Sequence, residues 1–168
     1  MLSCDNWYAV FVKTGKEERV SESIREIAGR VLVPKRVMKE RCRGMHRNTI
    51  RTLFPGYLFV QTDSMDGSKF TKIKRADNVI KPLFDPAQPK PIDPREMKPV
   101  LSLIDDNGVV NMSTAMYQNR QIKIIDGPLK GHEGLITKVD KHHNRVEVLV
   151  TIGQNTFKVS LGTEFIGI

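Results

Sequence analysis

The sequence of 168 residues lacks the features that mark membrane and secreted proteins. No apolar run approaches the roughly 18 residues that a transmembrane helix needs, so no membrane span is predicted. Residues 1–6 carry neither a basic segment nor an apolar segment, which argues against a signal peptide and favours the cytoplasm. Cysteine occurs only twice, as Cys4 and Cys42, and neither residue belongs to a CxxC pair. Both are therefore expected to be reduced thiols.

Motifs that carry chemistry are missing as well. The chain has no GxxxxGK[ST] phosphate-binding loop and no GxSxG nucleophile elbow. The adjacent histidines His142 and His143 do not combine with the two cysteines in a spacing that suits zinc. We therefore expect no metal, no cofactor and no catalytic site, and a protein that acts by binding.

Positive charge is in excess, with a net charge of +8. Much of it lies in residues 35–52, where seven basic residues and one acidic residue, Glu40, leave a charge of +6. A cluster this dense favours a polyanion or an acidic protein surface as partner, because each neutralised phosphate releases counterions. The alternative interpretation is a solvated basic loop without a partner.

The first hundred residues alternate predicted strands with predicted helices. Aromatic and β-branched residues predict strands at 7–12, 31–33, 57–60 and 79–84. Thr14 and Glu17 have the spacing of a capping box, and an apolar stripe follows and ends at Gly29. A second helix is predicted at 68–75, and a third begins at Asp93 and contains Pro99. This order predicts an antiparallel sheet flanked by helices.

The last fifty residues have the pattern of an all-β domain. Residues 106–119 show little pattern and are interpreted as a linker. Short strands are then predicted, separated by turns at 126–128, 141–144 and 153–155. Five such strands favour a small barrel. The predicted fold class is α+β, with an N-terminal domain at 1–105, a linker at 106–119 and a β-barrel domain at 120–168.

Two groups of residues resemble a known family. Four segments resemble the N-terminal domain of NusG-type elongation factors: Trp7-Tyr8-Ala9-Val10, Thr14-Gly15-Lys16-Glu17, Val31-Leu32-Val33-Pro34 and Phe54-Pro55-Gly56-Tyr57-Leu58-Phe59-Val60. A further segment, which follows an Ile-Lys-Ile strand, resembles a KOW motif. It reads Asp126-Gly127-Pro128-Leu129-Lys130-Gly131-His132-Glu133-Gly134. Together the two resemblances cover nearly the whole chain. Ribosomal proteins also carry KOW motifs, but that alternative leaves the first hundred residues unexplained.

The resemblance implies a mechanism. In this family the N-terminal domain docks on the clamp helices of the largest RNA polymerase subunit, holds the clamp closed and suppresses pausing. The KOW domain, an SH3-like barrel, reaches a second partner, which is a ribosomal protein, a termination factor or nucleic acid.

Aromatic residues near the strands are candidate polymerase contacts, because exposed aromatic side chains anchor protein interfaces. The alternative is that they are core residues, since strand alternation sends only half of them outward. The candidates are Phe11, Phe54, Tyr57, Phe59 and Phe84. By resemblance, the candidate contacts to the non-template DNA strand are Lys13, Lys16, Arg19, Lys74 and Arg75. Solvated helix side chains are the alternative for this basic set.

Two positions depart from the housekeeping members of the family. Ile152 is followed by Gly153, where those members carry an aromatic that packs on a ribosomal protein, and His132 occupies a position that is often aromatic. The KOW segment is instead rich in hydrogen-bond donors, although seven basic and five acidic residues from Asn119 onward leave only +2. Such a surface suits a structured RNA hairpin, with ordinary polar turns as the alternative. The candidates are Lys130, His132, Lys138, Lys141, His142, His143, Asn144, Arg145 and Lys158.

This pattern resembles specialised NusG paralogues, closest to the LoaP group of antiterminators, which act on long biosynthetic operons after meeting an RNA element in the leader. We expect a cytoplasmic monomer that binds RNA polymerase and a leader RNA hairpin, with no membrane partner. Two alternatives stay open. One is a housekeeping NusG that couples polymerase to a ribosomal protein or a termination factor, and the other is an RfaH-like paralogue recruited through DNA.

Overall fold

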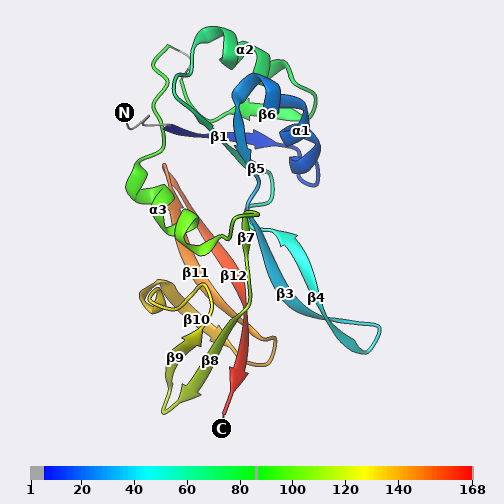
Figure 1. Ribbon diagram of the computed structural model, residues 1–168, viewed down its shortest axis with the longest axis vertical. Helices are drawn as coiled ribbons and strands as arrows, with labels where there is room; N and C mark the ends of the chain where they lie inside the picture. The colour runs from blue at the N-terminus through cyan, green and yellow to red at the C-terminus, as the bar shows by residue number, and fades with distance from the viewer. Residues whose placement is uncertain (1–5, 86, 168) are drawn as a thin grey trace. The chain divides into compact units, whose positions relative to one another are not determined.

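The structure is a computed structural model that describes residues 6–85 and 87–167, so Cys4 lies outside the described residues. The chain forms two compact units (Figure 1). The first unit comprises Met1–Val33 and Phe54–Met97, and the second comprises Pro34–Leu53 and Lys98–Ile168. Helices and largely antiparallel sheets confirm the predicted α+β class. Residues 34–53 group here with the C-terminal part of the chain, which differs from the predicted boundary at residue 105. The predicted domain boundaries therefore stay a prediction.

The first unit is built on a four-stranded antiparallel sheet. Its strand order is β2-β5-β1-β6, where the strands are β1 (Asn6–Val12), β2 (Arg30–Leu32), β5 (Tyr57–Thr62) and β6 (Val79–Pro82). The helices α1 (Glu17–Ala28) and α2 (Gly67–Arg75) pack side by side in this unit. These are the strands and helices that the alternation of apolar residues predicts.

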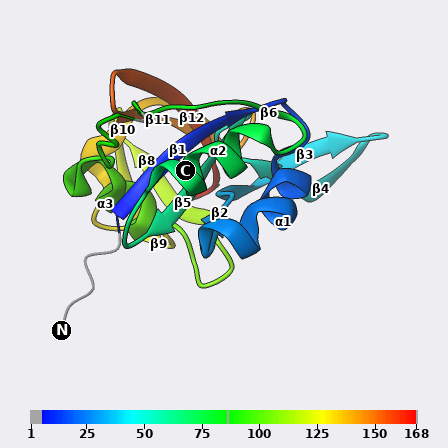
Figure 2. The same cartoon turned by 90° about the horizontal axis from the view of Figure 1, so that it is seen from above.

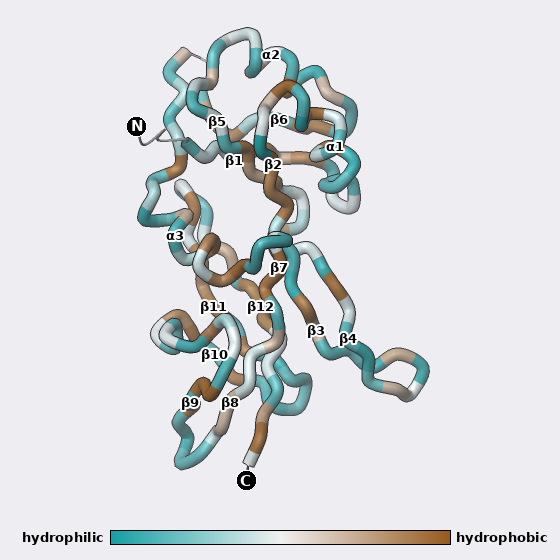
Figure 3. Tube along the Cα trace, viewed as in Figure 1, coloured by the Kyte–Doolittle hydropathy of each residue, from teal (hydrophilic) through white to brown (hydrophobic). Residues whose placement is uncertain are grey.

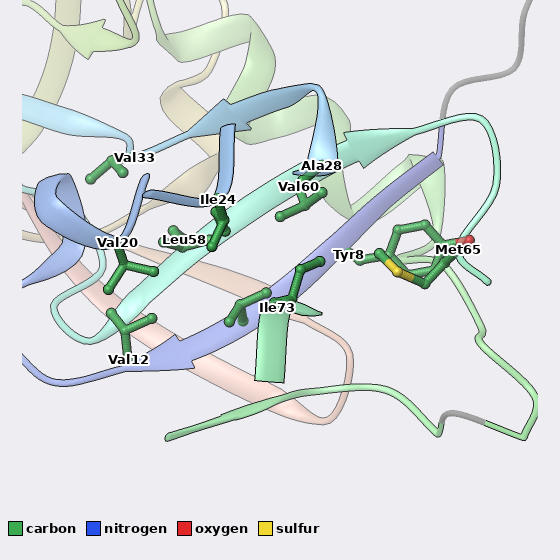
Figure 4. Close-up of a cluster of buried hydrophobic side chains, with 11 residues drawn as sticks. Tyr8, Val12, Val20, Ile24, Ala28, Val33, Leu58, Val60, Met65 and Ile73 are labelled. Carbon is green, nitrogen blue, oxygen red and sulfur yellow. The ribbon is translucent and has the colours of Figure 1, made fainter. Parts of the chain in front are cut away.

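One face of this sheet and the two helices enclose the core of the first unit. The cluster in Figure 4 combines alternate residues of β1 and β5 with the apolar stripes of the helices, including Tyr8, Val10, Val12, Val20, Ile24, Leu58, Val60 and Ile73. All of these except Tyr8 are fully buried. Burial of each such side chain contributes about 1.5–3 kcal/mol, so this cluster fixes the positions of both helices on the sheet.

The third helix, α3 (Pro94–Leu103), begins as the sequence predicts. The Asp93 carboxylate accepts a hydrogen bond from the backbone N–H of Arg95 (2.8 Å) and forms an ion pair with its guanidinium. Pro99 lies inside the helix. Among the described residues, none of the helices combines the length and the apolar character that crossing a membrane requires.

The second unit contains a β-hairpin and a five-stranded sheet. The hairpin consists of β3 (Lys35–Cys42) and β4 (Met45–Thr52), and β7 (Val109–Val110) adds to β3 in parallel. The larger sheet has the order β10-β11-β12-β8-β9, with β8 (Ser113–Gln118), β9 (Gln121–Asp126), β10 (Ile136–Asp140), β11 (Arg145–Ile152) and β12 (Asn155–Ile166). Figures 1 and 2 show the hairpin turn projecting away from these strands.

Two segments differ from the sequence-based expectation. Residues 35–52, which contain the basic cluster, form the β3–β4 hairpin instead of a loop, with Arg43 and Gly44 at its turn in positive φ. Residues 106–119, expected to be a linker, contain β7 and β8. Burial alternates at the start of β8, but its inward residues, Ser113 and Ala115, are too small to show a hydrophobic period in the sequence.

The KOW-like segment closes on β8 through a glycine. Gly127 has φ 100°, and a Cβ at this position would lie 2.6 Å from the Ser113 Cα. The Ser113 hydroxyl accepts a hydrogen bond from the buried backbone N–H of Leu129 (3.1 Å). Only glycine permits both this backbone conformation and this approach. The 3-10 turn η1 (Glu133–Leu135) then leads into β10.

Candidate functional site

The second face of the four-stranded sheet carries aromatic side chains. Phe11 of β1 lies opposite Tyr57 of β5 in the strand register, on the face away from the core cluster. Their ring centroids are 5.2 Å apart, and both side chains are half-buried. We call Phe11 and Tyr57 the aromatic patch.

The other three predicted polymerase contacts do not join this patch as exposed residues. Phe54 and Phe59 are each only 1% exposed, and their rings pack edge to face at 5.7 Å. Phe84 packs on Tyr8 and Phe70, at centroid distances of 5.1 and 5.3 Å, beside the core on the opposite face. The expectation that Phe54 and Phe59 are exposed contacts is therefore wrong, because packing covers both rings, whereas Phe84 is half-buried and its role stays a prediction.

The turn before Tyr57 is hydrogen-bonded to the buried carboxylate of Glu17, for which the sequence predicts a place in a helix capping box. Helix α1 begins at Glu17 with Lys16 as its N-cap residue, and no side chain caps it, so Thr14 is not the cap. Instead Glu17, only 4% exposed, accepts hydrogen bonds from the backbone N–H groups of Gly15 (2.9 Å) and Gly56 (2.8 Å). Glu17 thereby ties the turn before Tyr57 to the start of α1.

Gly56 completes this arrangement. It has φ 86°, and a Cβ there would lie 3.1 Å from Phe11 Cε2. Its carbonyl accepts a hydrogen bond from the Val12 N–H (2.8 Å), and the Tyr57 N–H bonds to the Phe54 carbonyl (3.0 Å). The Phe-Pro-Gly-Tyr segment is thus a tight turn that sets Tyr57 against Phe11.

The predicted DNA-contacting residues gather at one end of the first unit. All five are exposed: Lys13, Lys16, Arg19, Lys74 and Arg75. The backbone N–H of Lys13 donates to the Asn78 carbonyl (2.9 Å), which brings the end of β1 beside the segment that follows α2. We call these five residues the basic cluster of the first unit, and its concentrated charge suits a phosphate backbone.

The turn between β10 and β11, together with the first residue of β11, holds five of the predicted RNA contacts: Lys141, His142, His143, Asn144 and Arg145. The Asp140 carboxylate accepts from the His143 backbone N–H (3.1 Å) and contacts its Nδ1 (2.8 Å), and this hydrogen bond lowers the pKa of Asp140. Asn144 has φ 53°, and its carbonyl accepts from the Thr163 N–H (2.9 Å). The turn is therefore anchored, while the two histidine rings stay exposed and meet edge to face at 4.8 Å.

Within the turn, the Lys141 ammonium lies over the Tyr117 ring, 4.5 Å from its centroid. The other four predicted RNA contacts lie outside the turn and in separate places. Lys138 lines a small cleft with the acidic Asp140 and Glu147. Lys158 pairs with Leu149 on β11, four residues and about 13 Å along the strand from Arg145. Lys130 and His132 lie in the KOW-like turn before β10. The structure thus gathers the turn residues and disperses the others.

A cleft of about 600 Å³ joins the β10–β11 turn to the basic hairpin. Its lining residues are all charged or polar, and three lysine or arginine side chains outnumber one carboxylate: Lys39, Glu40, Arg41, His46, His142, His143, Asn144 and Arg145. We call it the basic cleft. The charge of residues 35–52 is evident from the sequence, but the sequence does not indicate that these residues lie next to the KOW segment. Only the hairpin geometry brings Lys39, Arg41 and His46 to that turn.

Several charges at the basic cleft are paired: the Lys39 ammonium lies 3.8 Å from the Glu164 carboxylate, and His143 Nδ1 lies 2.8 Å from Asp140. The Glu40 carboxylate accepts two hydrogen bonds from the Arg51 guanidinium (2.8 and 3.2 Å), and these bonds lower the pKa of Glu40. The pKa of Arg36 is lowered, mainly by burial and then by the nearby charge of Arg145. Arg36 does not line the basic cleft, but its guanidinium lies near Arg145, which does.

The described residues contain no group of three or more His, Cys, Asp and Glu side chains placed to hold a metal ion. Cys42, near the hairpin turn, is an exposed free thiol.

An antiparallel sheet flanked by two helices, together with a small β unit that carries a KOW-like turn, defines a class of two-part α+β proteins. The family model described as "Transcription termination factor nusG" matches residues 5–101, and the KOW motif model matches residues 118–148. The first match covers more than half of the chain, so the chain belongs to the NusG family.

Relatives match along most of their length. A Pseudomonas aeruginosa protein named transcription termination/antitermination protein NusG is 28% identical over 162 residues, which cover 89% of this chain and 91% of that protein. The Escherichia coli protein of the same name is 28% identical over 158 residues, with coverages of 87% and 86%. A solved structure described as "Domain interaction in Thermotoga maritima NusG" has a TM-score of 0.57 and 24% identity, covering 94% and 93% of the two chains. This structural likeness supports the fold.

Proposed function

We propose that this chain is an RNA polymerase-bound elongation and processive antitermination factor, recruited to specific operons by a structured RNA in the leader. Family membership supports the transcriptional role, and relatives carry the name transcription termination/antitermination protein. The observation that carries the RNA part is the basic cleft, where turn residues of the KOW segment meet the basic hairpin. Gly153, in place of the aromatic of housekeeping members, argues against a ribosomal protein as the partner of this segment.

Polymerase binding is assigned to the first unit. By family resemblance, the aromatic patch of Phe11 and Tyr57 docks on the clamp helices of the largest polymerase subunit. A rigid aromatic pair loses little conformational entropy on binding, which suits an interface anchor. The basic cluster of the first unit then contacts the non-template DNA strand, and bridging the DNA channel keeps the clamp closed.

The second unit selects the operon. Arginine and lysine side chains supply affinity through phosphates, and a few contacts to base edges or to the shape of the RNA supply selectivity. Both activities require binding only. The factor is therefore proposed to work in the cytoplasm without a nucleotide, metal or catalytic group of its own.

A second candidate is recruitment through DNA, as in RfaH-like paralogues. The exposed basic cluster of the first unit favours it, because these five residues offer phosphate contacts independently of the KOW segment. A housekeeping role in coupling polymerase to a ribosomal protein or a termination factor is the other alternative.

Transcription by purified polymerase tests these proposals on three matched templates. One carries the native leader of the operon, one carries base changes that break the RNA stem, and one adds compensating changes that restore it. We expect read-through of a downstream terminator with the first and third templates only. Equal read-through on all three templates would support the housekeeping role, and loss on both altered templates would support DNA recognition.

A further inference from the structure

The β3–β4 hairpin is held against the five-stranded sheet of the second unit. The Arg36 guanidinium donates a hydrogen bond to the Ser160 carbonyl of β12, and the Lys39 ammonium lies 3.8 Å from the Glu164 carboxylate of the same strand. Gly162 permits the contact, because a Cβ there would overlap the Val37 carbonyl oxygen. The hairpin is therefore a fixed neighbour of the sheet.

This attachment brings two basic segments, far apart in sequence, together in the lining of the basic cleft. Lys39, Arg41 and His46 come from the hairpin, and His142, His143 and Arg145 come from the β10–β11 turn and the start of β11. Both segments are coloured mostly as hydrophilic in Figure 3. The cleft has a volume of about 600 Å³.

We propose that the hairpin is the second wall of the RNA-binding site, so that the phosphate backbone of a structured RNA lies in the basic cleft between Arg41 and Arg145. This inference rests on the proposed RNA-binding function and extends it to a part of the chain outside the KOW segment. The β10–β11 turn of the KOW segment then forms one part of the RNA-binding site, and the hairpin forms the other part.

The chemistry of the lining favours a nucleic-acid backbone over a protein surface. Protein interfaces depend on buried aromatic and apolar anchors, whereas the eight lining residues are all charged or polar. The one acidic member, Glu40, is engaged by Arg51. Arginine and histidine donors converging from two sides match the oxygens of consecutive phosphates.

The test uses the full chain and a fluorescently labelled RNA stem–loop, with a DNA duplex of the same sequence for comparison. Affinity is measured by anisotropy for Arg41→Ala, Arg145→Ala and the double variant. Arg47→Ala is the matched control, because Arg47 lies in the same hairpin, is exposed and does not line the cleft. Thermal unfolding is recorded for every variant, and His142→Ala replaces Arg145→Ala if that variant unfolds at a lower temperature.

We expect Arg41→Ala and Arg145→Ala each to weaken binding of the stem–loop about three- to ten-fold. Each should also reduce the slope of log K against log salt by about one. Arg47→Ala should change affinity by less than about two-fold. The DNA duplex should bind more weakly than the stem–loop.

The outcomes separate this inference from the proposed function. If Arg145→Ala or its replacement weakens binding while Arg41→Ala matches Arg47→Ala, the hairpin is not part of the site and RNA binding by the KOW segment stands. If the wild-type chain does not prefer the stem–loop to the duplex, the proposed RNA function fails, and this inference fails with it.

Discussion

The aromatic patch of the first unit and the basic cleft of the second unit are built in opposite ways. The patch is a pair of half-buried rings, and beneath it the Glu17 carboxylate bonds two backbone N–H groups in a buried setting. The cleft is made of exposed or half-exposed charged side chains on a hairpin and a turn. Its principal ion pair, between Arg51 and Glu40, is largely open to solvent.

This difference determines what each surface can contribute. Rings held by buried hydrogen bonds give a short-range, salt-insensitive contact whose geometry depends on the folding of the first unit. Exposed cations attract a polyanion over about 8–10 Å, and salt screens the attraction. Changes near the patch should therefore alter stability and docking together, whereas changes in the cleft should alter binding with little effect on stability.

The largest effect is expected for Phe54→Ala. Because Phe54 is 1% exposed and packs on Phe59, its truncation should lower the free energy of unfolding by about 3–5 kcal/mol. Urea unfolding measures this loss, and Tyr57→Ala, a truncation of a half-buried ring, is the control. An equally small loss in the two variants would contradict the view that Phe54 is a core residue.

The second largest effect on stability is expected for Glu17, which bonds the turn before Tyr57. Glu17→Ala leaves the N–H groups of Gly15 and Gly56 without their acceptor, which should cost about 1–3 kcal/mol of stability. Glu22→Ala, on the exposed side of the same helix, should change stability by less than about 0.5 kcal/mol. Denaturant titration of both variants compares them directly. Equal stabilities would mean that the Glu17 bonds do not support the turn.

Docking itself is examined with Tyr57→Ala. If the patch anchors the polymerase, this variant should bind it about 30-fold more weakly, corresponding to roughly 2 kcal/mol. Binding is measured with purified polymerase at two salt concentrations, and the loss should be nearly independent of salt. Wild-type affinity in a folded Tyr57→Ala protein would show that polymerase docks on another surface of the chain.

The smallest effect is expected in the cleft. Glu40→Gln removes its one acidic lining residue, so affinity for the RNA stem–loop should rise about two- to five-fold at low salt. Stability should fall by less than about 1 kcal/mol, because the Glu40–Arg51 pair is exposed. A decrease in affinity would show that Glu40 orients Arg51 or Arg41 for binding.

The pH dependence of the Glu40–Arg51 pair follows from the lowered pKa of Glu40. Its stabilising contribution is present above the unfolded pKa of an ordinary glutamate and is lost as pH falls through the lower folded value. Between pH 5 and 8 the carboxylate therefore stays charged. The difference between wild type and Glu40→Gln should accordingly be constant across that range in thermal unfolding.

Strands and helices whose inward residues are large and apolar could be predicted from the sequence. Val20 and Ile24 recur at helical spacing in α1, and Val10 and Val12 alternate in β1, so local pattern and burial agree. The turn glycines also followed from sequence, since Gly44 and Gly153 adopt the positive φ that such turns need. The same logic missed β8, whose inward side chains are Ser113 and Ala115.

Which of these residues lie in contact depends on the packing of the folded chain. Alternation places Phe11, Tyr57 and Phe59 on one face, but packing against Phe54 covers Phe59 and leaves the first two as the patch. Charge density marked residues 35–52, yet their role depends on a hairpin that strand pairing and Gly162 hold beside the β10–β11 turn. Such contacts join residues more than a hundred positions apart, and a local sequence pattern carries no information about that distance.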